Sequence, residues 1–197
     1  MSLETWFAFF AACWVISLSP GAGAVASMSA GLNYGFRHGY WNAIGLQLAL
    51  LGQIAIVAAG LGALLAASAW AFELIKWLGV AYLVYLGWKQ WRSPVVDLHT
   101  EQPAKLHTSA SSLIMKGFLV NASNPKSIVF ILAVLPQFLD PQQPLLVQYL
   151  LMALTMLAVD LLVMAGYTGL AARVLRSLRS ADHQRLPDRT FGALFML

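Results

Sequence analysis

Long apolar runs alternate with short polar stretches along the whole chain. Five of these runs reach the length of about 20 mainly apolar residues that a helix needs to cross a bilayer. They cover approximately residues 6–28, 42–67, 70–91, 113–139 and 145–171. A sixth apolar run begins at Phe191, seven residues from the end of the sequence. Because seven residues make only about 10 Å of helix, we expect this run to be the start of a truncated sixth helix.

The composition supports a protein that lies in a membrane. Of the 197 residues, 59% are hydrophobic and only 10% are charged. A soluble domain normally carries about 25% charged residues, because its surface must face water. A bilayer-embedded chain has no such need, since lipid is its solvent. We therefore predict an all-α integral membrane protein with about six transmembrane helices and a single membrane domain.

The basic residues predict how the chain is oriented. Lys and Arg concentrate in the polar stretches 30–41, 89–116 and 172–190, whereas the connections 67–70 and 140–144 have none. Positively charged loops stay on the cytoplasmic side, so both termini should face outward. We expect a multi-pass protein of the bacterial inner membrane with a periplasmic N-terminus. The net charge of +4 then reflects topology and does not indicate a nucleic-acid partner.

One long polar connector divides the chain into two halves. Residues 92–112 contain two prolines and a run of Ser and Thr, and we expect them to form a cytoplasmic linker. Residues 1–91 and 113–197 each hold three of the apolar runs, the last one incomplete. Two related halves with an odd number of helices must be inserted upside down to each other. This pattern is typical of transporters built from two inverted repeats.

Proline interrupts the first apolar run of each half. Pro20 follows Ser19 and precedes Gly21, and Pro125 follows Asn124. Proline removes a backbone donor inside a helix and clashes with the preceding turn, so helices 1 and 4 should be broken. Paired interruptions in corresponding helices point to a binding site near the membrane midplane. A simple packing kink remains the alternative for each interruption.

Two charged residues lie inside apolar runs. Lys126 sits midway along the fourth run and Asp160 near the middle of the fifth. A charge at the bilayer centre costs about 2.5–3.5 kcal/mol on insertion scales, so each needs a partner or an aqueous cavity. We expect both to face one interior cavity, either paired or bridged by water or solute. Asp160 could exchange protons there, although a purely structural ion pair is an open alternative.

Other polar residues are weaker candidates. Tyr82 lies deep in the third run and its hydroxyl needs a partner, so it could line the solute path. Gln47 and Gln53 are weaker candidates of the same kind, and Arg37 could form part of an inner gate. The predicted substrate and ion pathway consists of Ser19, Pro20, Gly21, Gly23, Tyr82, Asn121, Asn124, Pro125, Lys126 and Asp160.

The sequence offers no catalytic constellation. The four histidines lie in polar stretches and lack the spacing of metal ligands. No nucleophile–histidine arrangement and no paired carboxylates occur within the apolar runs. We therefore predict neither an enzyme nor a protein with a metal ion or another cofactor.

Taken together, these motifs resemble the LysE/RhtB family of amino-acid exporters over nearly the whole chain. The matching residues are Ser19, Pro20, Gly21, Gly31, Gly35, Arg37, Gly39, Lys76, Trp77, Gly79, Tyr82, Leu83, Leu86, Gly87, Asn121, Asn124, Pro125, Lys126, Ser127, Pro136, Gln137, Phe138 and Asp160. The match is nearest to the homoserine/homoserine lactone exporter branch.

The resemblance implies a secondary transporter. It implies that the solute is a small neutral amino acid or derivative, such as homoserine, homoserine lactone or threonine. It also implies export from the cytoplasm by proton antiport. The partners would then be the solute, protons and the lipid bilayer, and a homo-oligomer is left open. The alternative from another class is a non-transporting membrane subunit that binds a partner through its basic cytoplasmic loops.

Overall fold

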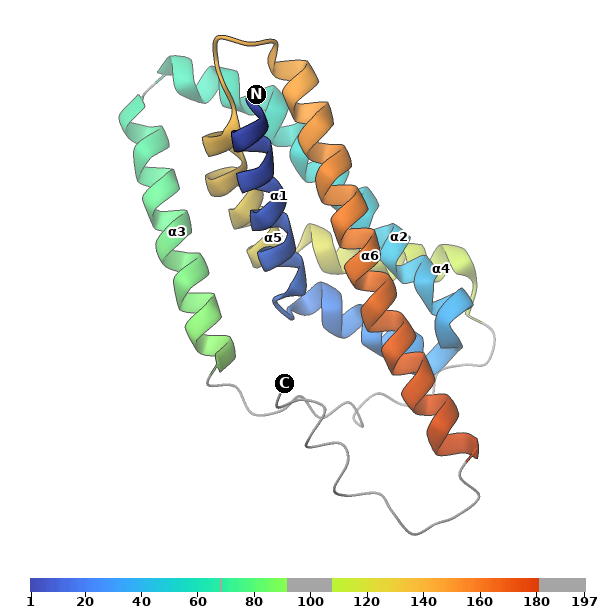
Figure 1. The fold of residues 1–197 in the computed structure, drawn as a ribbon. Coiled ribbons are helices and arrows are strands. Elements are labelled where there is room, and N and C mark those ends of the chain that lie inside the picture. The colour runs from blue at the N-terminus through green and yellow to red at the C-terminus, as the bar shows by residue number, and fades with distance from the viewer. Residues whose placement is uncertain (68, 92–107, 181–197) are drawn as a thin grey trace.

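The computed structural model describes residues 1–67, 69–91 and 108–180, and these residues are helical apart from short connections. Figure 1 shows them as a bundle of helices. The elements are α1 (Leu3–Leu18), α2 (Ala22–Ala67), α3 (Ala69–Trp91), α4 (Ala110–Ala122), α5 (Pro125–Val129), the π-helical turn η2 (Phe130–Val134), the 3-10 turn η3 (Leu135–Phe138) and α6 (Leu145–Ser180).

The long helix α2 is the centre of the bundle. Its most extensive contacts are with α4 and α6. The short helix α1 lies against α6 and η3. The helix α3 stands to one side in Figure 1 and contacts mainly the segment formed by α5 and η2.

The first predicted break is confirmed. The helix α1 ends at Leu18, and Ser19 takes an extended conformation with φ −69° and ψ 113°. The amide of Ser19 still donates to the carbonyl of Val15, which closes the last turn of α1. A new helix then begins at Ala22, so the apolar run 6–28 forms two helical segments in place of one.

The polar stretch 30–41 is a sharp kink within α2 and not a separate loop. Helical geometry continues on both sides of Gly35, which alone departs from it with φ 73° and ψ 174°. A positive φ of this size is readily available only to glycine. Gly35 therefore lets the second half of the broken first span join the second span directly.

The second predicted break is also confirmed, between α4 and α5. The helix α4 ends at Ala122, α5 begins at Pro125, and the two helical segments meet at an angle of 55°. Asn124 caps the new helix, because its side chain accepts a hydrogen bond from the amide of Lys126 at 3.1 Å. Proline at the first position of a helix is favourable, since that position needs no intrahelical donor.

The apolar lengths agree with a membrane protein. Among the described residues, α2 over Ala22–Gly60 and α6 over Leu145–Val174 are long and apolar enough to cross a bilayer, and the bent pair α4 and α5–η3 gives a third candidate. Large side chains such as Ile56, Leu146 and Leu162 are 74%, 71% and 64% exposed, as expected for a surface that faces lipid. The predicted sixth helix and linker residues 92–107 lie outside the described residues.

Glycine lets α2 and α4 cross with their backbones in contact. A Cβ added at Gly117 would lie 2.1 Å from the carbonyl oxygen of Asn42, and one at Gly45 would lie 1.9 Å from that of Ile114. Lipid is as apolar as the side chains, so the hydrophobic effect does not drive membrane helices together. Small residues at a crossing let the backbones approach closely and associate through van der Waals packing. This crossing fixes the first segment of the broken fourth helix against the centre of the bundle.

We predict that Gly117→Ala destabilises the protein, because the added methyl group forces the two helices apart. Overpacking of this kind costs about 1–3 kcal/mol. The measurement is the thermal unfolding temperature of the purified protein in detergent. Gly52→Ala is the matched control, since a Cβ at Gly52 meets nothing within 4 Å. Equal unfolding temperatures for the two variants would contradict the close crossing.

Candidate functional site

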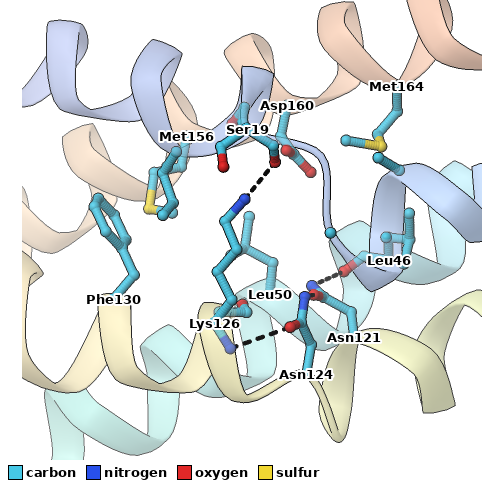
Figure 2. A pocket seen from close by; sticks show the side chains of 16 residues that line it. Ser19, Leu46, Leu50, Asn121, Asn124, Lys126, Phe130, Met156, Asp160 and Met164 are labelled. Carbon is cyan, nitrogen blue, oxygen red and sulfur yellow. Dashed lines mark hydrogen bonds between the residues drawn. The ribbon is translucent and has the colours of Figure 1, made fainter. Parts of the chain in front are cut away.

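A cavity lies where the two helix breaks meet. Figure 2 shows its lining, which comes from α1, α2, α6 and the two segments of the broken fourth helix. The lining residues are Ile16, Ser17, Ser19, Gly21, Gly23, Ala24, Leu46, Leu50, Asn121, Asn124, Lys126, Ser127, Phe130, Met156, Asp160 and Met164.

The walls of the cavity combine two kinds of surface. Leu46, Leu50, Phe130 and Met156 supply an apolar surface. The polar groups come mainly from the breaks and from Asp160. Mostly apolar walls with a few convergent polar groups are typical of sites that bind small molecules, because the polar groups fix the orientation of the ligand.

Lys126 reaches across this cavity. Its backbone lies in the first turn of α5, and its ammonium donates a hydrogen bond to the backbone carbonyl of Ser19 at the end of α1 (Figure 2). That carbonyl lies just beyond the last residue of α1, where the break interrupts the regular hydrogen bonding of the helix. A side chain from one broken helix therefore satisfies the backbone of the other.

Asp160 enters the same cavity from the middle of α6. Its carboxylate accepts a hydrogen bond from Gln47 Nε2 at 2.5 Å, and Ser17 is a second hydrogen-bond partner. The expectation that Lys126 and Asp160 face one cavity is met. They form no direct ion pair, however, because each charge has its own polar partners.

A polar network anchors the second break to α2. Asn124 donates to the side-chain oxygen of Asn121 at 3.3 Å, and Asn121 donates to the carbonyl of Leu46 at 2.8 Å. Gln53 of α2 donates to the backbone carbonyl of Asn121 at 2.8 Å and accepts from the hydroxyl of Ser127 at 2.7 Å. These bonds hold the start of α5 at a defined position beside the cavity.

The remaining predicted residues lie at different distances from the cavity. Pro20 and Pro125 sit in the two breaks and shape the backbone beside it. Tyr82 is half-buried in α3 next to Tyr85, with their ring centroids 6.2 Å apart, and lies outside the cavity lining. Arg37 is exposed beyond the Gly35 kink and is also outside the lining. The pathway role of Tyr82 and the gating role of Arg37 stay predictions.

Several site residues gave little sequence signal. Met156 and Met164 line the cavity, but apolar side chains in an apolar run are not conspicuous. Their spacing of four residues on either side of Asp160 places all three on one face of α6, which would have identified them. Tyr167 also escaped notice, although its hydroxyl donates to the carbonyl of Leu18 at 2.8 Å. Within the described residues, no group of three or more His, Cys, Asp or Glu could hold a metal ion.

Comparison with known proteins relates the whole chain to membrane translocators. A family model described as LysE type translocator matches residues 14–197. The homoserine/homoserine lactone efflux protein of Salmonella typhimurium is 42% identical over 198 residues, which cover 100% of this chain and 95% of that protein. An uncharacterised membrane protein of Vibrio cholerae is 44% identical over 196 residues, with the same coverage of 100% and 95%.

A more distant relative is named for the efflux of a different amino acid. The leucine efflux protein of Enterobacter sp. is 25% identical over 183 residues, which cover 92% of this chain and 86% of that protein. No solved structure matches the chain.

We predict that Asn124→Ala lowers the unfolding temperature of the purified protein in detergent. The variant loses the side-chain acceptor for the amide of Lys126, and losing such a cap costs about 0.5–2 kcal/mol. Asn124→Ser is the control, because a serine hydroxyl supplies the same acceptor. If the unfolding temperature of Asn124→Ala is no lower than that of Asn124→Ser, the helix cap does not stabilise the second break.

Proposed function

Because this chain belongs to the LysE type translocator family, we propose that it exports small neutral amino acids or their derivatives by proton antiport. Homoserine, homoserine lactone and threonine are the solutes to test first. The observation that carries this proposal is the cavity between the two helix breaks, which holds both interior charges, Lys126 and Asp160.

The relatives support the general class of activity. They include proteins named for efflux of homoserine, homoserine lactone and leucine, all small amino acids or derivatives. Members of this family are membrane transporters and not enzymes. A cavity with mostly apolar walls and few polar groups suits a solute whose polar ends are fixed and whose side chain is small.

The polar groups divide into two roles in the proposed mechanism. Backbone groups at the helix breaks and the ammonium of Lys126 bind the amino and carboxyl ends of the solute. Asp160 exchanges a proton as the cavity opens to one side of the membrane and then to the other. An acidic group in a membrane interior is well placed for this task, since such residues commonly form proton relays.

We further propose that the protein has two inverted halves, residues 1–91 and 113–197, joined by the linker 92–112. The support is that the first helix of each half is broken and that both breaks border one cavity. Transporters with inverted repeats place their sites between corresponding discontinuous helices. The proposed location is the bacterial inner membrane, with the N-terminus in the periplasm because the basic stretches lie in the alternate connections.

We predict that Asp160→Asn abolishes coupled efflux while the protein still inserts and folds. The measurement uses purified protein in liposomes that are loaded with labelled homoserine and given a proton gradient. Asp160→Asn should reduce gradient-driven efflux by at least about tenfold, which corresponds to about 1.4 kcal/mol in the barrier. Glu73→Gln is the matched control, because Glu73 lies on α3, outside the cavity, and pairs with Lys76 at 2.5 Å.

The outcomes separate the two parts of this proposal. Equal efflux by wild type and Asp160→Asn would remove Asp160 from the coupling mechanism. If homoserine, its lactone and threonine leave the liposomes no faster than they leave loaded liposomes without protein, the proposed solutes are contradicted. Such a result would favour a non-transporting subunit that binds a partner through its basic loops.

A further inference from the structure

The ammonium of Lys126 occupies a position that is built to receive a cation. Its partner is the carbonyl oxygen of Ser19, which the break in the first helix turns toward the cavity (Figure 2). The carboxylate of Asp160 lines the same cavity and forms no direct ion pair with Lys126, so it can attract a second cation there. A carbonyl and a carboxylate are hydrogen-bond acceptors, and a primary ammonium carries three donors and no acceptor.

We infer that the carbonyl of Ser19, with the carboxylate of Asp160 in the same cavity, forms a binding site for a primary ammonium group, and that Lys126 is its internal occupant when no solute is bound. An amino-acid solute carries the same group. Its ammonium therefore replaces that of Lys126 at the carbonyl of Ser19, and the released Lys126 then meets the carboxylate of the solute. The inference deepens the proposed function and rests on it only for the identity of the solute.

The geometry around Lys126 fits an occupant that can leave. A Cβ added at Gly21 would lie 3.4 Å from Cδ of Lys126 and 3.7 Å from its Nζ, so the lysine stem lies beside the first break without being tightly enclosed there. The side chain is only half-buried, and it is anchored on α5 while its partner Ser19 belongs to the end of α1. Moving the side chain of Lys126 therefore breaks its hydrogen bond between the two broken helices and leaves the hydrogen bonds of Asn121 and Asn124 in place.

An internal ammonium group stabilises the acidic cavity when no solute is bound. If no ammonium occupied this cavity, the carboxylate of Asp160 would have only the neutral partners Gln47 and Ser17, which is costly in an apolar layer. A tethered ammonium of the same chemistry fills the site between transport events. A zwitterionic solute then brings one ammonium, which replaces that of Lys126, and one carboxylate, which pairs with the displaced Lys126.

The test restores the missing group from solution. Lys126→Ala removes a propylammonium unit from the side chain, so added n-propylammonium should bind the vacated site. We expect it to raise the unfolding temperature of purified Lys126→Ala in detergent by at least about 2 °C in a saturable manner, at constant ionic strength. Wild type should show no such rise, because its own lysine fills the site.

Three controls and one double variant make the result specific. Propanol has the size of propylammonium without its charge, and tetramethylammonium has the charge without a donor, so neither should stabilise Lys126→Ala. Lys76→Ala removes a lysine that pairs with Glu73 on α3 outside the cavity, and propylammonium should leave it unchanged. Adding Asp160→Asn to Lys126→Ala should weaken the propylammonium effect by at least about tenfold in concentration.

The outcomes decide the inference without any transport assay. If Lys126→Ala binds no propylammonium, or responds equally to propanol, the ammonium site does not exist. If Lys126→Ala does not fold alone, recovery of monodisperse protein by propylammonium but not by propanol during solubilisation supports the site, and no recovery overturns it. Normal homoserine efflux by wild type together with a negative propylammonium result would leave the proposed function standing and remove only this inference.

Discussion

The structure depends on one constraint, which is that backbone groups freed inside an apolar layer must find polar partners within the protein. The break after α1 interrupts the regular hydrogen bonding of the carbonyls at its end. The hydroxyl of Tyr167 in α6 donates a hydrogen bond to the backbone carbonyl of Leu18 at 2.8 Å. The ammonium of Lys126 in α5 donates one to the backbone carbonyl of Ser19. Both partners come from residues after the linker, so the first break is stabilised by contacts with the later part of the chain.

The polar groups at the second break form hydrogen bonds with neighbouring residues and with α2. Asn124 caps the new helix, Asn121 reaches the carbonyl of Leu46, and Gln53 receives the hydroxyl of Ser127. Asparagine and glutamine suit this task because each amide offers both donors and an acceptor. The consequence for function is a cavity whose polar groups are held by the same bonds that stabilise the fold. In the proposed mechanism, a solute that enters this cavity competes with the bond between Lys126 and Ser19, while the bonds of Asn121 and Asn124 stay in place.

The sequence was sufficient to predict the breaks and the shared cavity, since proline inside an apolar run interrupts a helix and a charge at mid-depth requires polar surroundings. It was not sufficient to identify partners. The similar depth of Lys126 and Asp160 suggested that the two charges are paired or bridged, but the chain path through the first break brings a backbone carbonyl to the lysine. The kink at Gly35 was also hidden, because a glycine-rich polar stretch predicts a loop as readily as a bent helix. Met156 and Met164 are apolar residues in an apolar run, so only their helical spacing from Asp160 distinguishes them from lipid-facing residues.

The central claim is that the cavity between the breaks is the solute site, and protection from a thiol reagent tests it most directly. Cys13 is buried, so Cys13→Ser gives a background without thiols, since the chain has one cysteine. In that background, homoserine should slow modification of the thiol introduced by Ser127→Cys, which lies in the cavity lining, and not of that introduced by the exposed Ser111→Cys. Equal modification rates at the Ser127→Cys position with and without homoserine, homoserine lactone or threonine would contradict the claim.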